Sequence, residues 1–471
     1  MLFNSVEFLF FLLVTVAVFA LSPRMFRRHI LLAASLYFYA SWSVSYLFLL
    51  LFVIVTSYAA GLLIIRRGRR EACIAMAAIT CPLAVLGVFK YGNFVIDNVN
   101  VLFAGFGSGL AFDGLELLLP VGISFYTFQA IAYVVDVKAG RVESERSLID
   151  YALYISFFPQ LVAGPIERPG NILPQIKRNL LADGGNISLG VSLILQGFFK
   201  KLVIADRLGR YVDKVYLDIG GHSPEQLVVA MYYFAFQIYC DFSGYTDIAR
   251  GVARLFNVEL MVNFDRPYLA RSLQEFWRRW HISLSTWFRD YLYIPLGGSR
   301  KGLSRTLLHI MVVFGLCGLW HGAAYTFVVW GALHGVFLCI EQGYRKAFPA
   351  KGGRNALLGL VQVIVTFHLT CLLWVFFRAE TIGDAFGFMG LMFRSPSLEG
   401  VLQVALFDYQ NFLGTVCIVL LMAFEVMPIG RARHAPAVRC CVWRYAASVA
   451  LLCAVLALGM FESAPFIYFQ F

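Results

Sequence analysis

The chain has 471 residues, of which 60% are hydrophobic and 14% charged, and its mean hydropathy is +0.72. Soluble domains are roughly 25% charged, so this composition excludes a water-soluble globular protein and indicates an integral membrane protein. The formal net charge is +11, but the Lys and Arg residues form short clusters between apolar runs, as the positive-inside rule predicts for cytoplasmic loops. We therefore expect membrane lipid, and no nucleic acid, to meet these charges.

Apolar runs recur along the whole chain, residues 1–471, without a linker or low-complexity stretch that would mark a second domain. Spans of about 20 residues with short loops would give roughly ten to fourteen segments in one integral-membrane domain. In the N-terminal third the expected spans are residues 6–21, 30–42, 46–65, 73–89 and 115–137, with a Gly-rich loop at 95–114. The first run carries its positive charges after the apolar stretch, which predicts a retained span and not a cleaved signal.

The basic clusters also predict how the chain crosses the membrane. With each cluster in the cytoplasm, the N-terminus lies outside, residues 431–444 form an inner loop, and residues 446–461 cross outward for the last time. Residues 462–471 are then external. We expect both termini on the periplasmic side.

Two segments near the middle of the chain do not resemble simple spans. Residues 157–168 place two prolines and a glycine at the end of a short apolar run, and residues 234–255 carry polar and charged side chains, among them Asp241 and Ser243. Irregular backbone and charges at membrane depth are tolerated only where protein or a polar cavity surrounds them. We expect a buried break at the first segment and a water-filled or substrate-lined interior at the second.

Residues 303–340 form two apolar runs that predict a transmembrane hairpin with His321 at its apex. From residue 307 to 340 the hairpin contains three histidines and no Asp, Glu, Lys or Arg. An ionisable side chain in such a segment is costly, which makes His321 a functional candidate if it faces protein or water. The alternative is an interfacial histidine beside a belt tryptophan, Trp320.

A second polar stretch, residues 263–301, is too polar to span a membrane and too aromatic for an ordinary loop. Phe276, Trp280, Ser283 and Trp287 recur every three or four residues, which predicts one face of an amphipathic helix at the inner membrane surface.

Basic residues outnumber acidic ones by seven to two between residues 266 and 301. Such a surplus attracts anionic lipid headgroups or, through arginine forks and aromatic faces, holds the phosphates of a cofactor. The candidate donor-binding or site-lining residues are Trp277, Arg278, Arg279, Trp280, Ser283 and Ser285 in this stretch, Trp320 in the hairpin, and Asp241 and Ser243.

Sequence motifs for metal, nucleotide and hydrolase sites are absent. No HxH, HExxH or acidic cluster accompanies His321 or His334, and neither a Walker loop nor GxSxG occurs. The ten cysteines include no CxxC pair and lie mainly in or beside apolar segments, as small core residues do. We expect no metal site.

Ten short motifs, spread nearly from end to end, resemble one known family in order and spacing. They are FKYGNF at 89–94, LPVGISFY at 119–126, AGPI at 163–166, GFFKK at 197–201, DFSGY at 241–245, residues 277–298, LWHG at 319–322, WGALHG at 330–335, FFRAE at 376–380 and YFQF at 468–471. The chain resembles a membrane-bound O-acyltransferase of the bacterial alginate O-acetyltransferase branch. One departure is Leu333, where the family commonly has tryptophan.

The resemblance implies an all-α polytopic membrane protein, a helical bundle with re-entrant and interfacial helices around a central cavity. It implies that an acetyl group passes from a cytoplasmic thioester donor, acetyl-CoA, across a bacterial inner membrane to an extracytoplasmic polysaccharide. His321 matches the catalytic histidine of the family, and His281 matches the second polar position of its site. A neutral His321 could then act as general base, while His281 or a nearby Trp or Ser side chain could donate a hydrogen bond to the oxyanion.

Alternatives to this activity remain open on the sequence. A transporter of an acyl donor or a glycan, without chemistry of its own, also uses intramembrane histidines and broken helices. A D-alanyl transferase of the teichoic-acid type would take its donor from an acyl carrier protein, whose acidic surface could meet the basic stretch. An alginate-like exopolysaccharide is the favoured polymer, with cellulose and peptidoglycan also open. The expected partners are a periplasmic SGNH-type acetyltransferase or esterase and the polysaccharide synthesis machinery.

Overall fold

The computed structural model describes residues 1, 3–64, 69–107, 109–162, 164–178, 180, 184–348, 356–427, 441–461 and 466–467, with backbone alone at 69 and 441–444. These residues fold into helices joined by turns and short extended segments, and no strand occurs among them. The all-α fold expected from the sequence is therefore confirmed. Contacts divide the chain into two compact units, each of which is described by itself. The expectation of a single domain over residues 1–471 stays a prediction.

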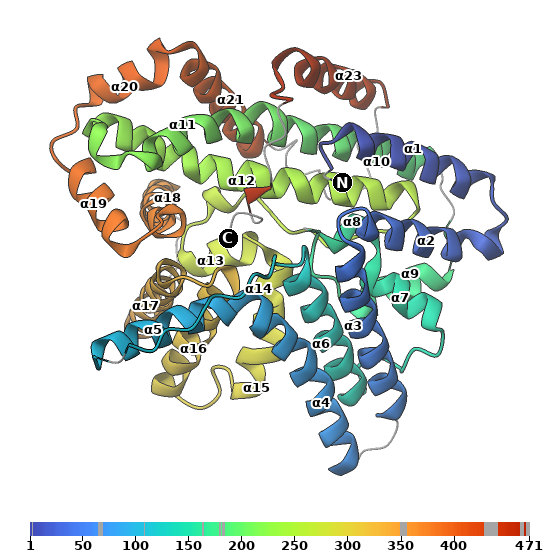
Figure 1. Cartoon of the computed structure of the whole chain (residues 1–471). Helices are drawn as coiled ribbons and strands as arrows, with labels where there is room; N and C mark the ends of the chain where they lie inside the picture. Colours follow the sequence, from blue (N-terminus) through green and yellow to red (C-terminus); the bar gives the residue numbers. More distant parts are fainter. Residues whose placement is uncertain are drawn as a thin grey trace. The chain divides into compact units, whose positions relative to one another are not determined.

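The first unit comprises Met1–Gly190, Ala249–Met261 and Gly322–Ala324. Its helices are α1 (Val6–Leu21), η1 (Arg24–Phe26), α2 (Arg27–Ala40), α3 (Val44–Leu63), α4 (Arg69–Leu86), η2 (Gly87–Tyr91), α5 (Gly92–Gly105), α6 (Ile123–Lys138), α7 (Leu148–Ser156), α8 (Phe158–Leu161), α9 (Pro169–Arg178) and the start of α10 (Gly184–Phe198) (Figure 1). Ser5, Ser43 and Ser147 begin α1, α3 and α7, because each side chain accepts a hydrogen bond from a backbone N–H of the first turn.

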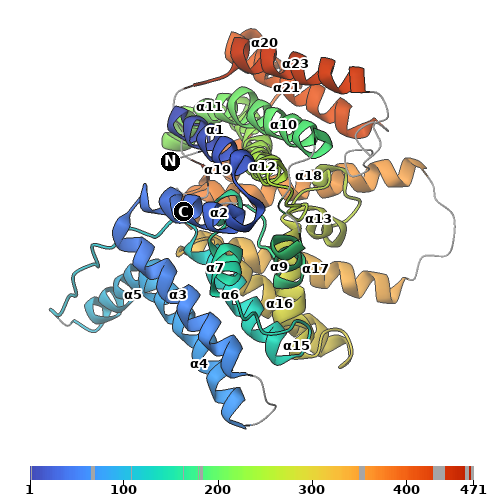
Figure 2. The same ribbon diagram turned by 90° about the vertical axis from the view of Figure 1, so that its right-hand side faces the viewer.

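The second unit comprises Val191–Ile248, Val262–His321 and Tyr325–Phe471. Its further helices are η3 (Phe199–Ala205), α11 (Asp206–Leu217), η4 (Ile219–Gly221), α12 (Pro224–Leu255), η5 (Pro267–Leu269), α13 (Leu273–Arg279), α14 (Ile282–Phe288), η6 (Arg289–Tyr293), α15 (Ile294–Leu296), α16 (Leu303–His321), α17 (Tyr325–Ala347), α18 (Ala356–Arg378), α19 (Ile382–Met392), α20 (Leu398–Phe407), α21 (Tyr409–Val426) and α23 (Cys441–Leu458) (Figure 2). The long helices α10 and α12 each continue from one unit into the other.

Seven helical segments of the described chain are long and apolar enough to cross a membrane. They are Val44–Leu63, Arg70–Gly105, Gly184–Leu217, Leu303–His321, Tyr325–Ala347, Ala356–Arg378 and Tyr409–Val426. This count confirms a polytopic membrane protein but is below the roughly ten to fourteen spans that division of the chain by span length predicts. The difference arises because α1, α19, α20 and the described part of α23 are apolar but shorter, between 10 and 17 residues.

Two expectations for residues 95–137 are partly wrong. The first half of the loop expected at 95–114 is helical, and the first residues of the span expected at 115–137 are not. Helix α5 follows α4 through the π-helical turn η2, and residues 109–120 form an extended segment before α6 begins. The cause is a pair of amide side chains on α5, Asn93 and Asn100, each of which exchanges two hydrogen bonds with the backbone of one residue in the extended segment. The two asparagines thus supply the hydrogen bonds that a neighbouring strand would otherwise provide.

The break expected at residues 157–168 is confirmed. Helix α7 ends at Ser156, the single turn α8 follows, and the chain continues through buried residues until α9 begins at Pro169. Gly122, which precedes α6, lies so close to this break that a Cβ there would stand 2.3 Å from the carbonyl oxygen of Leu161. Its φ of +76° is also one that glycine adopts without strain.

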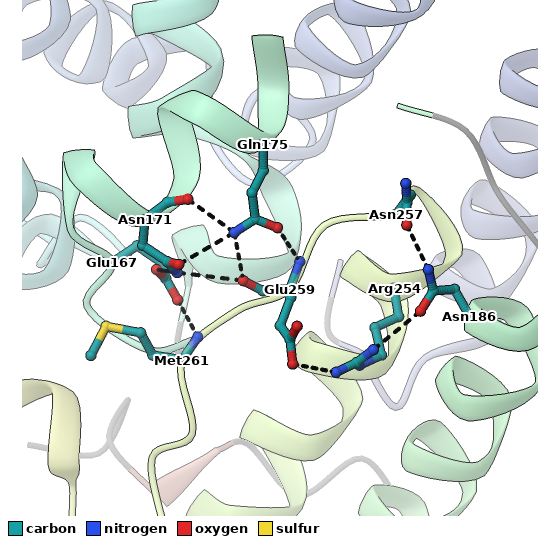
Figure 3. Close-up of polar contacts among 8 residues, drawn as sticks. All are labelled: Glu167, Asn171, Gln175, Asn186, Arg254, Asn257, Glu259 and Met261. Atoms are coloured by element: carbon teal, nitrogen blue, oxygen red, sulfur yellow. Dashed lines mark hydrogen bonds and ion pairs between the residues drawn. The ribbon is translucent and has the colours of Figure 1, made fainter. Parts of the chain in front are cut away.

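A buried carboxylate after the break, Glu167, fixes the extended segment that follows α12. Its Oε1 accepts a hydrogen bond from the backbone N–H of Met261, and its Oε2 accepts one from the side chain of Asn171 at 2.7 Å. Gln175, one turn further along α9, exchanges two hydrogen bonds with the backbone of Glu259 (Figure 3). Burial raises the pKa of Glu167 to about 7, although these hydrogen bonds act in the opposite direction.

Two consecutive lysines of the π-helical turn η3 are buried in ion pairs with aspartates of the second unit. The Nζ of Lys200 lies 2.7 Å from Asp247, and the Nζ of Lys201 lies 2.7 Å from Asp241 and 2.9 Å from Asp206. The polar stretch of α12 was expected to face water or substrate. At Asp241 and Asp247 it instead forms ion pairs with buried lysines. Removing either lysine would leave buried carboxylate charge uncompensated, at a cost of about 3 to 5 kcal/mol.

The described part of the predicted external tail, Phe466 and Ile467, is buried in the second unit. The backbone N–H of Ile467 donates to Asp241 Oδ2 at 2.7 Å, and the ring of Phe466 packs at 4.7 Å from that of Tyr245. Asp241 therefore joins a buried lysine to the end of the chain. The rest of the expected tail and residues 431–440 of the inner loop expected at 431–444 lie outside the described residues. Residues 441–444 of that loop belong instead to the start of α23.

The transmembrane hairpin expected at residues 303–340 is confirmed as α16 and α17, which lie side by side (Figure 1). Glycines let the two backbones touch: a Cβ at Gly318 would stand 2.2 Å from the carbonyl oxygen of Phe327, and one at Gly331 would stand 2.3 Å from that of Phe314. Small residues of this kind are how membrane helices gain close van der Waals packing. His321 is the last residue of α16.

Candidate active site

The predicted amphipathic helix over residues 263–301 is wrong as a single element, because the chain breaks between α13 and α14. His281 is the break: it has φ +42° and ψ +54°, a left-handed conformation that is uncommon for a residue with a side chain. The side chains of the expected apolar face are buried within the protein, with Phe276 1%, Trp280 0% and Trp287 8% exposed, and the expected position at the inner membrane surface stays a prediction. A backbone held in a rare conformation at a buried histidine indicates a functional constraint.

Asn263 holds this break from a distance of eighteen residues. Its backbone carbonyl accepts a hydrogen bond from the N–H of Ile282 at 2.9 Å, and its side-chain oxygen accepts one from the N–H of Ser283 at 3.1 Å. These are among the first N–H groups of α14, which have no acceptor within the helix. Asn263 therefore caps α14 in place of a residue next to it in the chain.

The side-chain oxygen of Asn263 also meets His281 Nδ1 at 3.2 Å and Ser283 Oγ at 2.9 Å. Three rings also pack against His281: Phe242 at 4.7 Å, Phe264 at 6.5 Å and Trp320 at 5.9 Å between ring centroids. His281 is 0% exposed, and this burial lowers its pKa to about 3. The imidazole is therefore neutral at physiological pH.

His321, 3% exposed, is enclosed by aromatic rings that meet it edge to face. Its ring centroid lies 5.0 Å from Trp320, 5.0 Å from Trp330 and 5.3 Å from Phe377, at interplanar angles of 81°, 87° and 72°. Trp320 is shared, since its ring also packs against that of His281. The two histidines picked out from the sequence therefore contact the same tryptophan, although they lie forty residues apart. His281 precedes α14, and His321 ends α16.

A third histidine, His334 on α17, belongs to the same cluster. The indole N–H of Trp277 donates to its Nδ1 at 3.2 Å, and its ring lies 4.8 Å from that of Trp330. Trp330 packs against both His321 and His334, so it links them much as Trp320 links His321 and His281. His334 is 0% exposed.

The other candidate residues divide into those near the histidines and those held elsewhere. Trp277, Trp280, Ser283 and Trp320 lie in the cluster or beside it, and Ser285 donates from its hydroxyl to the carbonyl of Trp280 at 3.1 Å. Asp241 is engaged by Lys201 and Ile467, and Ser243 lies buried two residues further along α12. These positions do not test the roles expected for them.

The two arginines expected to bind the donor differ in their surroundings. Arg279 pairs with Glu275 one turn earlier and donates to the carbonyl of Arg266, whereas Arg278 is exposed and forms no ion pair within the part of the chain that the structure describes. A guanidinium already engaged by a carboxylate has fewer donors left for a phosphate. Of the pair, Arg278 is the better placed to bind one.

Three residues that were not among the candidates from the sequence complete the site. Asn263, Trp330 and Phe377 contact the histidines directly. Trp330 and Phe377 lie in the WGALHG and FFRAE motifs, but nothing in their spacing predicts a contact with His321, because they lie on other elements. Trp330 is 0% exposed, and its indole N–H has no hydrogen-bond acceptor among the described residues. Groups of three or more His, Cys, Asp or Glu residues that could hold a metal ion do not occur in the described ranges.

The chain matches the model of MBOAT, the membrane-bound O-acyltransferase family, over residues 142–377, a range that includes all three clustered histidines. It is 38% identical over 435 residues to the probable alginate O-acetylase AlgI of Pseudomonas aeruginosa, covering 91% of this chain and 81% of that protein. It is 37% identical over 383 residues to the peptidoglycan O-acetyltransferase of Helicobacter pylori, covering 75% and 71%.

A more distant relative is the teichoic acid D-alanyltransferase of Bacillus subtilis, 25% identical over 271 residues, which cover 54% of this chain and 68% of that protein. The family match covers half of the chain, and the AlgI match nearly all of it. The helical membrane fold agrees with these matches. The chain therefore belongs to the membrane-bound O-acyltransferase family and is an O-acyltransferase.

Proposed function

We propose that this enzyme transfers an acetyl group from acetyl-CoA, bound on the cytoplasmic side of a bacterial inner membrane, to a hydroxyl of an extracytoplasmic polysaccharide. His321 is the general base. The observation that supports the proposal most directly is the buried position of His321 at the end of a membrane helix, beside a second neutral histidine. The 37% and 38% identical relatives are named for alginate and peptidoglycan O-acetylation.

The transfer needs one proton to be moved twice. His321 takes the proton from the acceptor hydroxyl as its oxygen attacks the thioester carbonyl, which gives a tetrahedral intermediate with a negatively charged oxygen. When the intermediate collapses, the carbon–sulfur bond breaks, the acetyl group stays on the polysaccharide, and the thiolate takes the proton back from His321. General-base catalysis of this kind contributes roughly 10²- to 10⁴-fold in rate.

The developing oxyanion needs a donor in a site that excludes water. The indole N–H of Trp330 suits this role because an indole can only donate, and the ring lies 5.0 Å from that of His321. A buried donor without an acceptor costs about 1 to 3 kcal/mol, which a substrate oxygen would recover. Trp280 is the second candidate for the oxyanion donor. It is fully buried, and its indole N–H also has no hydrogen-bond acceptor among the described residues.

Two alternative activities differ from the proposal in testable ways. A transporter without chemistry does not agree with membership of an O-acyltransferase family. Transfer of D-alanine from an acyl carrier protein is favoured by the relatives named as teichoic acid D-alanyltransferases, but these are 25% and 29% identical over about half of the chain. Acetyl transfer is the better supported of the two, since its relatives match at higher identity over more residues.

The test is acceptor-dependent thioester turnover by the purified enzyme in nanodiscs. Acetyl-CoA labelled in the acetyl group is mixed with oligosaccharides of alginate, cellulose or peptidoglycan, with and without a periplasmic SGNH-type partner. We expect free CoA to appear faster when one acceptor is present, and label to appear on that acceptor, with alginate the favoured polymer. Turnover of D-alanyl carrier protein but not of acetyl-CoA would reject acetyl transfer in favour of the alternative.

The orientation in the membrane belongs to the same proposal. Arg345 and Lys346 end α17 on the side opposite to His321 and are expected in the cytoplasm, with both chain termini in the periplasm. An Arg345→Cys variant in intact cells should react with a thiol reagent only after the inner membrane is made permeable. Labelling from the periplasm would reverse the orientation.

A further inference from the structure

We propose that Asn263 is a positioning residue that holds His281 in the tautomer with its proton on Nδ1, so that Nε2 is an acceptor. This deepens the proposed function and rests on it. The consequence is that His281 receives a hydrogen bond in the site and cannot donate one to the oxyanion, which was one of the roles expected for it.

The first step is to identify which atom of the Asn263 amide faces His281. The backbone N–H of Ser283 can only donate, and it meets the same amide atom at 3.1 Å. That atom must therefore be the oxygen, Oδ1, and not the NH₂ group. The assignment follows from the hydrogen-bond network and not from the shape of the amide, whose two ends look alike.

The second step follows from the chemistry of the two side chains. A carbonyl oxygen accepts, so His281 Nδ1, at 3.2 Å from Oδ1, must carry the hydrogen. A neutral imidazole has one N–H, and burial keeps His281 neutral. Nε2 is then the nitrogen with the lone pair. The left-handed backbone of His281 and the cap on α14 hold the ring where Asn263 can reach it.

His334 provides the contrast within the same cluster. Its Nδ1 meets the indole N–H of Trp277, which can only donate, so Nδ1 is the acceptor and the neutral ring carries its hydrogen on Nε2. The two buried histidines are therefore held in opposite tautomers by partners of opposite kind. A cluster that merely packed rings together would need no such distinction.

The direct test is the protonation of the two histidines, measured by nitrogen NMR on enzyme labelled with ¹⁵N in histidine and reconstituted in nanodiscs. Subtracting the spectra of His281→Gln and His334→Gln assigns the signals. We expect hydrogen on Nδ1 for His281 and on Nε2 for His334. Hydrogen on Nε2 of His281 in the wild-type enzyme would overturn the proposal, whatever the activity.

The kinetic test compares Asn263→Leu, which removes the acceptor, with Asn263→Asp, which keeps it. We expect Asn263→Leu to lower kcat by roughly 10- to 100-fold with little change in KM for acetyl-CoA, as losing the partner that orients a site histidine does. Asn263→Asp should recover most of this loss. The carboxylate of Asn263→Asp would take the place of the amide oxygen that meets His281 Nδ1, so it should raise the pKa of His281 and move the acid limb of the pH profile to higher pH. The rings of Phe242, Phe264 and Trp320, which pack against His281, do not titrate.

Asn411→Leu is the matched control. Asn411 is also buried, 7% exposed, and its side chain donates to the carbonyl of Val404 on α20, away from the histidines. It should lower thermal stability as Asn263→Leu does while leaving kcat of the folded enzyme unchanged. Equal losses of kcat in both variants, or an unchanged kcat in Asn263→Leu, would reject the positioning role while leaving acetyl transfer by the wild-type enzyme as the separate test of function.

Discussion

Each of the two units buries an ionisable side chain at a bend of the chain. Burial disfavours the charged form of both, so it raises the pKa of the carboxyl and lowers the pKa of the histidine. Glu167 in the first unit is surrounded by donors, so its pKa rises only to about 7. His281 in the second unit packs against aromatic rings and meets one amide oxygen, and burial lowers its pKa to about 3. A pKa near 7 is often taken as the mark of a site. Here that pKa belongs to Glu167, whose oxygens hold backbone and an amide side chain, while the histidine of the candidate site is neutral.

The comparison is tested most strongly at His321. His321→Ala should lower acetyl transfer by at least roughly 10²- to 10⁴-fold, because it removes the base, and should leave the thermal unfolding temperature in detergent close to that of the wild type. His309→Gln is the matched control, since His309 is buried on the same helix, where its Nδ1 meets the carbonyl of Gly298 at 3.0 Å, away from the histidine cluster. Normal product acetylation by a stably folded His321→Ala enzyme would remove the base from the mechanism.

We expect the buried ion pairs to contribute to the stability of the fold and not to catalysis. Asp241→Asn keeps an acceptor for the N–H of Ile467 but removes one of the two carboxylates that face Lys201. Because Asp206 still pairs with the lysine, we expect a loss of about 1 to 3 kcal/mol in stability. Asp213→Asn breaks a partly exposed pair with Arg378 and should cost less than about 1 kcal/mol. Thermal unfolding of both variants gives the comparison. Equal effects would mean that burial adds nothing to the Asp241 pair.

We expect the titration of Glu167 to change the stability of the protein with pH and to leave the rate of catalysis unaffected. Its folded pKa lies above the ordinary value of 4.5, so the stability it contributes is complete below pH 4.5 and is lost as the pH rises through 7. The shift corresponds to roughly 3 kcal/mol. Glu167→Gln cannot titrate and should flatten the fall in unfolding temperature between pH 5 and pH 8. Parallel curves for variant and wild type would show that Glu167 does not titrate there.

The smallest effect separates the two arginines of α13. Arg278→Ala should raise KM for acetyl-CoA by about ten- to a hundredfold if the side chain binds a phosphate, with kcat little changed. Arg279→Ala should instead lower stability by less than about 1 kcal/mol, because its pair with Glu275 is part-exposed. Steady-state kinetics in nanodiscs measures both. An unchanged KM in Arg278→Ala would reject phosphate binding by this arginine and favour a contact with anionic lipid headgroups.

The sequence predicts much of this fold because apolar runs and glycines act over neighbouring residues. The hairpin of α16 and α17 and the break after α7 follow from such local patterns. The break at His281 could not be predicted, since the periodicity of residues 276 to 287 continues across it and the residue that holds it, Asn263, lies eighteen positions earlier. Lys201 likewise has a partner forty positions away, which no spacing indicates.

The candidate site shows the same limit. His321 and His281 could be picked out because they match a family, and Trp320 because it adjoins His321 in the chain. Trp330 and Phe377 reach His321 from α17 and α18, and only packing shows this. The described residues contain fewer spans than chain length suggests, because several apolar helices, α1 among them, are shorter than a membrane span. The asparagines of α5 also fix a non-helical segment where the span expected at 115–137 would have begun.

The backbone contact at Gly318 and Gly331 limits which parts of the enzyme can move during a turnover. Helices that touch through carbonyl oxygens, with no side chains between them, have no soft layer in which one could slide past the other. His321 and Trp330 then travel as one rigid piece. In the proposed reaction, donor and acceptor reach His321 from opposite faces of the membrane, and a gate that admits them would have to be hinged outside this hairpin.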